Sequence, residues 1–525
     1  MPLRNRLLPL LVAPVLVAVA VVAFVAINKT VNDGHLIFPL DDPYIHLAMA
    51  RNISTTGTWG INPGEFASTS SAPLYTLTLA GMMALFGPSE LYAWLLAISG
   101  GLFASYLFGR RAQAVGFGSG AVIIAGIYFV AVIGLVELSI SGMEHTWHMC
   151  AVMAVAGAAE RILGRPAGSW RQGWILILLV LIAAGLRYET LFLLPPLCLM
   201  LWSARWRTLA VIVGIVGLIP AVALGILQIS QGGSFLPNTI IVKAFDTATP
   251  GLFGYVYRFL QQISSSRWIV LIAAAGAALW IGGRQSQKWL QPRMVGPALA
   301  GFVILAHCAF AIDYPRYVGY LVALGSWALL PWVREWIAFL REHATSWPHR
   351  AVAAGLVVVC LVLPFGDQIR NWTLLPLLGQ DIYRQQYQMA RFASTYYPGR
   401  AVAFNDIGLV AWTGKNRVLD LWGLANDRVA HWRNDREYDS KHIGEVTAEY
   451  MAPVVMIYPS WFVRYGGVPS DWYRVGNWQL PPGIRVNAGA PVVFLYATSE
   501  AEARTLLKNL KEFEPSLPQG VQAGY

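Results

Sequence analysis

Charged residues are scarce in this chain of 525 residues: 13% are Asp, Glu, Lys or Arg, whereas 56% are hydrophobic. Soluble domains carry roughly twice that share of charge. A mean hydropathy of +0.50 is too high for a single soluble core and indicates many segments in contact with lipid. The composition therefore excludes disordered, collagen-like and ordinary cytosolic proteins.

Cysteine is also rare, with four residues, each inside an apolar run. There is no CxxC pair and no disulfide framework, so these side chains are expected to be small buried hydrophobes. The sequence also lacks an internal repeat and a glycine-rich nucleotide loop. Its net charge is +10, but no basic cluster is dense enough for DNA. We therefore expect basic cytoplasmic loops and no nucleic-acid partner.

Long apolar runs dominate the first two thirds of the chain. Residues 7–27 follow Arg4 and Arg6 and exceed the apolar core of a signal peptide, which has about 7 to 15 residues, so we expect an uncleaved first helix with a cytoplasmic N-terminus. The runs on either side of Arg187 are short and could be half-length or tilted helices. The eleven expected crossings lie near residues 7–27, 90–109, 118–137, 146–160, 174–186, 188–202, 208–229, 268–283, 294–312, 316–333 and 351–366.

The Lys and Arg residues between these runs are unevenly distributed. Eleven crossings from a cytoplasmic N-terminus place fifteen of them inside and seven outside, in agreement with the positive-inside rule. This count requires residues 72–87 to lie in the outer interface as an amphipathic helix that does not cross. The C-terminus is then outside.

The composition changes after residue 366, where polar residues become frequent. Strand-like runs alternating with helical patterns predict a small α/β domain. We expect an α-helical polytopic membrane domain at 1–366, with its first outer loop at 28–89, and a periplasmic α/β domain at 367–525. The expected strands are 401–406, 417–421, 453–458 and 491–496, and the expected helices are 383–396 and 499–511.

Ionisable residues gather at the helix ends assigned to the outer face. Such groups are costly near lipid and indicate a functional site. Their shared side predicts a cavity that opens at the outer leaflet, whereas a transporter places such charges near the midplane. Taken one at a time, each could equally be an interfacial side chain that reaches water. The set comprises Asp41, Asp42, Glu137, Glu144, Arg187, Glu189, Lys243, Asp313 and Arg316.

The most informative local motif is DDPYIHLAMARNI at residues 41–53. Pro43 suits the first position of a helix, which makes Asp42 its expected N-cap. Asp41 is then available as a general base that takes a proton from a hydroxyl. The two carboxylates could also bind a divalent cation such as Mg²⁺, Mn²⁺ or Ca²⁺, or simply be solvated.

Histidines and cations flank the remaining motifs. His46, His145 and His148 lack the fixed spacing of a zinc site, so interfacial or hydrogen-bonding roles are favoured. Arg187 could form an ion pair with Glu189 at a helix end. The guanidinium and ammonium groups that a phosphate head group would need are those of Arg187, Lys243 and Arg316.

Taken in chain order, these motifs resemble the GT-C superfamily of membrane glycosyltransferases. The similarity is strongest to the bacterial branch containing the terminal arabinofuranosyltransferases of mycobacterial cell walls, whose pattern is close to DDAY, SGMET and LLPNT. It is weaker to lipid A aminoarabinose transferases, protein O-mannosyltransferases and oligosaccharyltransferase catalytic subunits. The matching segments are DDPY, APLYTLTLAGMMALFG, SGMEH, LRYET, GSFLPNT and FNDIGLVAWTGKNRVLDLWGLAND.

The resemblance implies an enzyme of the bacterial inner membrane whose active site faces the periplasm. It would move a sugar, such as arabinofuranose, from a polyprenyl-phosphate donor to a hydroxyl of a cell-envelope glycan or glycolipid. The catalytic aspartate falls on Asp41 or Asp42, and the capping argument favours Asp41. Direct displacement by the activated hydroxyl would invert the anomeric centre. The expected substrate-binding residues are Tyr44, His46, Glu144, His145, Arg187, Glu189, Asn238, Lys243, Arg316 and Tyr317.

Two departures from the branch pattern bear on specificity: His145 replaces the usual Thr, and Arg187, Tyr188 and Glu189 replace Arg-Pro-Glu. The alternative class is a transporter or flippase for a lipid-linked sugar, which would need inverted repeats and midplane charges. A membrane-anchored receptor would need no carboxylates in its first outer loop. The sequence shows neither inverted repeats nor midplane charges, and its first outer loop does carry two carboxylates.

Overall fold

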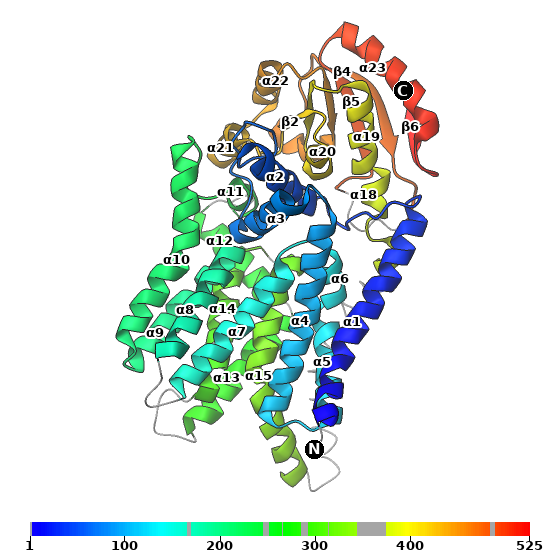
Figure 1. Cartoon of the computed structure of the whole chain (residues 1–525). Helices are drawn as coiled ribbons and strands as arrows, with labels where there is room; N and C mark the ends of the chain where they lie inside the picture. Colours follow the sequence, from blue (N-terminus) through cyan, green and yellow to red (C-terminus); the bar gives the residue numbers. More distant parts are fainter. Residues whose placement is uncertain are drawn as a thin grey trace.

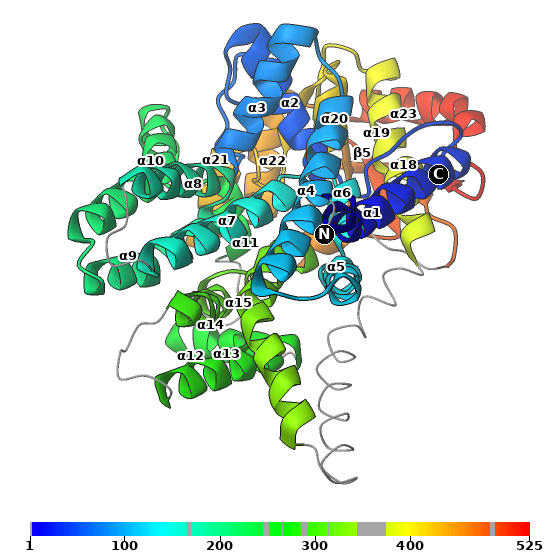
Figure 2. The ribbon, with the colours of Figure 1, turned by 60° about the horizontal axis from the view of Figure 1, so that its bottom comes forward.

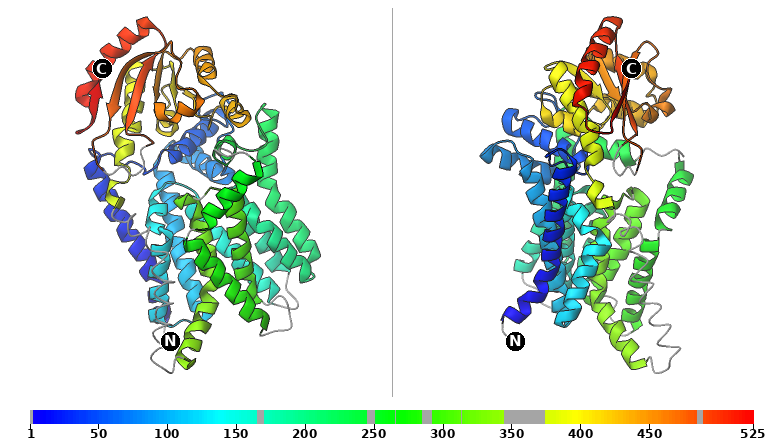
Figure 3. Two further views of the ribbon diagram at one scale, coloured as in Figure 1. Left: turned by 180° about the vertical axis from the view of Figure 1, so that it is seen from behind. Right: turned by 90° about the vertical axis from the view of Figure 1, so that its right-hand side faces the viewer.

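The computed structural model describes residues 3–164, 170–244, 251–264, 266–284, 292–312, 314–343, 374–483 and 489–525. A bundle of helices forms one part of the molecule, and a domain containing a β-sheet covers one end of it (Figure 1). The N-terminus lies at the opposite end of the bundle, and the C-terminus lies in the sheet domain. This arrangement is the same in the side and rear views (Figure 3).

The bundle is centred on α7, which contacts α4, α8, α14 and α15. Helices α8, α9 and α10 form a group on one side, and α12, α13 and α14 form another (Figure 2). Every apolar run expected from the sequence is helical where it is described, whereas the run at 351–366 and the boundary at 366 lie outside the described residues. The bundle comprises α1 (Leu3–Val31), α4 (Leu91–Val115), α5 (Ser119–Ile133), α6 (Leu135–Ile140), α7 (His145–Leu163), α8 (Trp170–Leu186), η1 (Tyr188–Leu193), α9 (Leu194–Ser203), α10 (Arg207–Ser230), α12 (Gly251–Ile263), α13 (Ser266–Arg284), α14 (Pro292–Phe310) and α15 (Pro315–His343).

Within the described ranges, four helices are long and apolar enough to cross a membrane, or five if the bent pair Val256–Ile263 and Trp268–Trp280 is one span. Shorter apolar helices such as Ser119–Ile133 and Trp170–Leu186 lie beside them. The structure thus shows a mostly helical chain with apolar helices of membrane-spanning length. The number of eleven crossings and their direction stay predictions. The four long helices are Leu7–Val31, Leu91–Val115, Arg207–Ser230 and Pro292–Phe310.

Three short helices lie between the bundle and the sheet domain: α2 (Asp42–Thr56), α3 (Pro73–Phe86) and α11 (Asn238–Ala244). Helix α3 has 14 residues, fewer than the roughly 20 that cross a bilayer. It packs on α2, which in turn packs on the sheet domain. The expected location of residues 72–87 in the outer membrane interface stays a prediction.

The sheet domain contains six strands in the order β2-β1-β3-β5-β4-β6. Strands β1, β2 and β3 are parallel, and β5, β4 and β6 add to them in antiparallel fashion. The four expected strands are present, whereas β4 and β6 were not predicted. The elements are α18 (Gln380–Arg384), α19 (Gln386–Tyr396), β1 (Ala401–Phe404), α20 (Gly408–Thr413), β2 (Arg417–Asp420), α21 (Asp427–Asp435), α22 (Ser440–Glu449), β3 (Val454–Ile457), β4 (Tyr473–Gln479), β5 (Val492–Ala497), α23 (Glu500–Phe513) and β6 (Gln522–Gly524).

The carboxyl ends of the three parallel strands lie at one edge of the sheet, because parallel strands run in the same direction. This edge faces the bundle, since Gly408, shortly after β1, contacts Asp41 at the start of α2. Ligands of open α/β sheets commonly bind outside the carboxyl ends of the strands. The fold thus brings such an edge next to the first loop of the membrane domain.

A buried amide ties α1 to the start of the sheet domain. The Asn28 side chain donates to the backbone oxygens of Ile37 (3.1 Å) and Leu378 (3.0 Å), and its oxygen accepts from the Ile37 N–H (2.8 Å). Asn28 is fully buried. The hydrogen bonds fix the direction in which the chain leaves the first helix towards Asp41.

Candidate functional site

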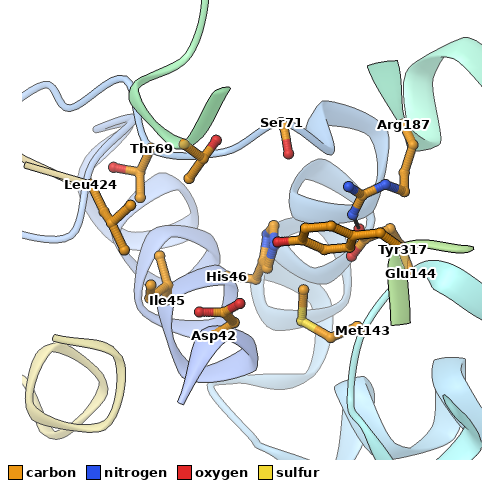
Figure 4. A pocket seen from close by; sticks show the side chains of 11 residues that line it. Asp42, Ile45, His46, Thr69, Ser71, Met143, Glu144, Arg187, Tyr317 and Leu424 are labelled. Atoms are coloured by element: carbon orange, nitrogen blue, oxygen red, sulfur yellow. Dashed lines mark hydrogen bonds and ion pairs between the residues drawn. The ribbon is translucent and has the colours of Figure 1, made fainter. Parts of the chain in front are cut away.

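A pocket lies at the end of the bundle beneath the sheet domain. The space between its walls is about 400 Å³, a value that includes solvent at its open mouth. Its walls come from α2, the loops before α3 and α7, the α8–η1 junction, α11, α15 and the loop after β2. Figure 4 shows the residues that line it: Asp42, Ile45, His46, Thr69, Ser71, Met143, Glu144, Arg187, Thr239, Tyr317 and Leu424.

Asp42 faces this pocket from the first turn of α2. Its carboxylate lies 2.5 Å from the Arg316 guanidinium in the first turn of α15. Both side chains keep about a fifth of their surface exposed, 23% for Asp42 and 22% for Arg316. A neighbouring cation favours the ionised form of a carboxyl group, which is the form that a general base needs.

Asp41, which the sequence favoured as the base, is not among the residues that line the pocket, and its catalytic role stays a prediction. Its buried carboxylate accepts hydrogen bonds from the Gly408 N–H (2.5 Å) and the Leu409 N–H (2.8 Å) at the start of α20. Burial and the neighbouring carboxyl of Asp406 raise the pKa of Asp41 well above its ordinary value. Asp41 therefore joins the first loop to the sheet domain and does not line the pocket.

The capping argument fails because α2 begins one residue earlier than expected. Asp42 is the first helical residue, and Asp41 stands at the N-cap position without a side-chain cap hydrogen bond. A Cβ at Gly408 would lie 2.1 Å from the Asp41 carbonyl oxygen, so only glycine allows this close approach. That contact could not be read from the DDPY motif.

Arg187 lies between two carboxylates at the α8–η1 junction. Its guanidinium lies 2.5 Å from Glu144 and 2.5 Å from Glu189, with a second hydrogen bond of 2.9 Å to Glu189. Its Cζ also lies 4.6 Å from the centre of the Tyr317 ring. The expected Arg187–Glu189 pair is present, and Glu144 extends it into a buried triad.

The SGMEH loop positions Glu144 and His145. Gly142 has φ +68°, and a Cβ there would meet the Phe38 ring at 2.4 Å. The Tyr75 hydroxyl donates to the Gly142 carbonyl (2.7 Å) and thereby fixes the loop to α3. The His145 ring lies 5.6 Å from the Tyr317 ring, next to the pocket wall.

His46 and Tyr44 occupy different environments on α2. His46 lines the pocket, and its Nδ1 lies 2.9 Å from the Thr76 hydroxyl. Tyr44 is 1% exposed, accepts from the Phe38 N–H (3.2 Å) and packs edge-on against the Phe38 ring. Tyr44 is thus a core residue, which corrects its expected substrate-binding role.

Asn238, from the GSFLPNT motif, links the bundle to the sheet domain. Its side chain donates to Asp427 Oδ1 (2.5 Å), and its backbone N–H donates to the Ser68 carbonyl (2.7 Å). The next residue, Thr239, lines the pocket. Asn238 therefore supports the pocket wall. Lys243 lies in the same short helix, and its side chain is outside the described part of the structure, as is Asp313.

Sequence reasoning missed six of the lining residues: Ile45, Thr69, Ser71, Met143, Thr239 and Leu424. The motifs around Met143, Thr239 and Leu424 were recognised, but no signal showed which of their side chains face a ligand. Three of the polar atoms at the pocket are buried and have no hydrogen-bond partner among the described residues: Thr69 Oγ1, Glu144 Oε2 and Thr239 Oγ1. Buried polar atoms are normally paired, so this wall is suited to a polar ligand.

The two adjacent aspartates do not form a joint cation site in this geometry, because Asp41 binds backbone amides and Asp42 binds Arg316. Among the described residues, no group of three or more His, Cys, Asp or Glu side chains could hold a metal ion. A divalent cation therefore stays an untested expectation.

Comparison with solved structures identifies the fold. ArnT from Cupriavidus metallidurans in the apo state shares 14% identity and a TM-score of 0.50, over 92% of this chain and 98% of ArnT. The archaeal oligosaccharyltransferase AglB from Archaeoglobus fulgidus, in complex with an inhibitory peptide and a dolichol-phosphate, shares 11% identity and a TM-score of 0.48, over 95% of this chain and 78% of AglB. Both belong to the GT-C superfamily. The likeness to ArnT shows that the two chains share a fold, whereas the superfamily, the number of crossings and the arabinofuranosyltransferase branch stay predictions for this chain.

At the sequence level, residues 380–496 match the model of a family described as a domain of unknown function, DUF8728. This range covers most of the sheet domain. No curated protein matches the chain.

Proposed function

We propose that this protein is a GT-C-type glycosyltransferase that moves a sugar from a polyprenyl-phosphate donor to a hydroxyl group. The observation that carries the proposal is the contact between Asp42, which lines the pocket, and Arg316 beside it, at the end of a bundle of apolar helices. At this end of the bundle a base lies next to a cation. A phosphate carried by a lipid and an acceptor dissolved in water can both reach this position. The fold shared with ArnT supports the same assignment.

The chemistry assigns each group one task. The Asp42 carboxylate takes the proton of the acceptor hydroxyl, and the oxygen attacks the anomeric carbon. The bond from that carbon to the phosphate oxygen breaks, and polyprenyl phosphate leaves with the bonding electrons. Arg316 stabilises the charge of the phosphate. One displacement on the face opposite the phosphate inverts the anomeric centre.

The finer assignments follow from the motifs. We propose a pentofuranose such as arabinofuranose as the sugar, and a cell-envelope glycan or glycolipid as the acceptor. Supporting this, DDPY, SGMEH and LPNT all lie at the pocket end of the bundle. The proposed location is the bacterial inner membrane, with the pocket and sheet domain in the periplasm. Cysteine labelling from outside the cell at the sheet domain, together with protection near Arg110, would test this direction.

The decisive experiment uses the purified protein in nanodiscs. Polyprenyl-phosphate sugars are supplied with acceptor glycans, the acceptor being chosen by comparing envelope glycans of wild-type and deletion strains by mass spectrometry. Asp42→Asn should reduce turnover at least about 100-fold, the usual contribution of a general base. Asp471→Asn, an exposed carboxylate of the sheet domain, is the control and should remain active.

Two outcomes would contradict the proposal. One is full activity of Asp42→Asn. The other is movement of a lipid-linked sugar across the bilayer without a new glycosidic bond, which would favour the flippase alternative. Adding a chelator to the same assay tests separately whether activity requires a divalent cation.

A further inference from the structure

We propose that the carboxyl edge of the sheet binds the acceptor as a saccharide chain, on an aromatic platform formed by Trp422, Trp461 and Tyr465. This inference rests on the proposed function for the identity of the acceptor. It assigns a second binding site, beside the pocket and on the other domain. Its support comes from the ring cluster, the position of the cluster, the connecting loop and the chemistry of the rings.

The platform is a cluster of rings that are packed together but remain partly accessible. The Trp422 ring lies 4.7 Å from Trp461 and 6.2 Å from Tyr465, measured between ring centres. All three side chains are only half-buried. The guanidinium carbon of Arg433 lies 3.8 Å from the centre of the Trp422 ring, and that of the exposed Arg464 lies 4.8 Å from Tyr465.

The position of the platform links it to the pocket. Trp422 follows β2, and Trp461 follows β3, so both lie beyond the carboxyl ends of parallel strands. Leu424, two residues after Trp422, lines the pocket. Two residues span at most about 7 Å of chain. The platform is therefore carried by the same loop that contributes Leu424 to the pocket wall.

The connecting loop is held firmly. Asp420 accepts from the Trp422 N–H (2.7 Å) and the Ala425 N–H (2.6 Å). Farther along, Asp427 accepts from Asn238 (2.5 Å) and from the Ser68 N–H (3.3 Å), which fixes the loop to the membrane domain. The platform and the pocket therefore keep a constant distance.

The chemistry of the platform fits a saccharide. A sugar ring has a C–H face that packs on an aromatic ring and an edge of hydroxyls that hydrogen-bond to donors such as guanidinium groups. The donor cannot use this route, because its polyprenyl tail must stay among the apolar helices below. Asp42 lines the same pocket as Leu424 and contacts Arg316 on α15. A ligand arriving from the sheet domain is thus the water-borne acceptor.

The test compares two tryptophans of the sheet domain. Trp461→Ala removes a platform ring. Trp472→Ala removes a half-buried ring that packs near Tyr496, at the opposite edge of the sheet, because Tyr473 pairs with Ala497 and Ala497 with the start of β3. Binding is measured by calorimetry on the full-length protein in nanodiscs, with arabinan, mannan and glucan hexasaccharides as probes.

We expect at least one hexasaccharide to bind the wild type and Trp472→Ala equally, and to bind Trp461→Ala at least tenfold more weakly. In the transfer assay, Trp461→Ala should raise KM for the hexasaccharide acceptor about tenfold, leaving kcat and the donor KM within threefold. A merely structural ring would lower kcat and stability as well. Absence of binding to the wild type, or equal losses in both variants, would overturn the inference. Binding without any transfer would uphold it and refute the proposed function instead.

Discussion

Asp42 and Arg316 are 274 residues apart in the sequence, yet their side chains meet at 2.5 Å beside the pocket that Asp42 lines. The pair joins the first turn of α2 to the first turn of α15. Because both side chains are partly exposed, a phosphate that enters the pocket can share the guanidinium without leaving Asp42 buried and unpaired. The first prediction follows from this geometry.

Arg316→Lys should weaken the binding of a polyprenyl-phosphate donor analogue by about tenfold, since an ammonium group cannot bind phosphate in a bidentate manner. Its melting temperature should hardly change, because a partly exposed ion pair contributes under about 1 kcal/mol. Arg293→Lys is the matched control, since Arg293 on α14 pairs with Glu335 on α15 at 3.3 Å. Unchanged donor affinity in Arg316→Lys would leave Arg187 and Lys243 as the phosphate candidates.

Asp41→Ala should destabilise the contact between the first loop and the sheet domain. Two backbone N–H groups of α20 would lose their acceptor, and each orphaned buried donor costs about 1 to 3 kcal/mol. We expect a clear fall in melting temperature and faster proteolysis of the sheet domain. The control is Asp439→Ala, which removes an exposed N-cap of α22 and costs about 1 kcal/mol. Lost transfer with unchanged stability would restore Asp41 as the base.

Arg187→Met should be far more damaging than Glu189→Gln. Without the guanidinium, Glu144 and Glu189 would face each other buried and unpaired, and breaking a buried ion pair in this way costs about 3 to 5 kcal/mol. Glu189→Gln leaves the pair between Arg187 and Glu144 intact. Thermal unfolding in detergent is the measurement, with the exposed Arg171→Met as control. Equal melting temperatures for the two triad variants would contradict this prediction.

The strands and helices that were predicted from the sequence are those whose own residues show a clear apolar pattern. The runs at 453–458 and 491–496 are apolar, each with two adjacent valines, and both form strands. Strand β4 escaped because YRVGNWQ mixes polar and apolar residues, and β6 because its three residues are too few to show a pattern. Both owe their conformation to the neighbouring strand.

The lining residues that could be predicted from the sequence are those that belong to short motifs of neighbouring residues. His46, Glu144, Arg187 and Tyr317 were all expected, and all line the pocket. The expected N-cap was wrong, since α2 begins at Asp42, and the contact of Asp41 with Gly408, 367 residues farther along the chain, was not foreseen. A contact over that distance leaves no trace in the spacing of a short motif.

The last prediction concerns pH and the loop that connects the pocket to the platform. Burial raises the pKa of Asp420 to about 6 from its ordinary value of 3.8, against the effect of the backbone N–H groups that it accepts. A raised carboxyl pKa means that the folded state holds the proton more tightly than the unfolded state. The stability contributed by this group is therefore complete below about pH 4 and is lost as the pH rises through 6. The shift corresponds to about 3 kcal/mol.

We expect the melting temperature of the wild type to fall more steeply between pH 4.5 and 7.5 than that of Asp420→Asn, which cannot titrate at this position. The substitution also removes one hydrogen-bond acceptor for the backbone of the loop. This loss lowers the stability equally at every pH, so the difference in slope between the two proteins can still be measured. Because the same loop carries Trp422 and Leu424, saccharide binding by the wild type should follow the same pH dependence. Parallel curves for the two proteins would mean that Asp420 stays ionised throughout, held by its two backbone donors.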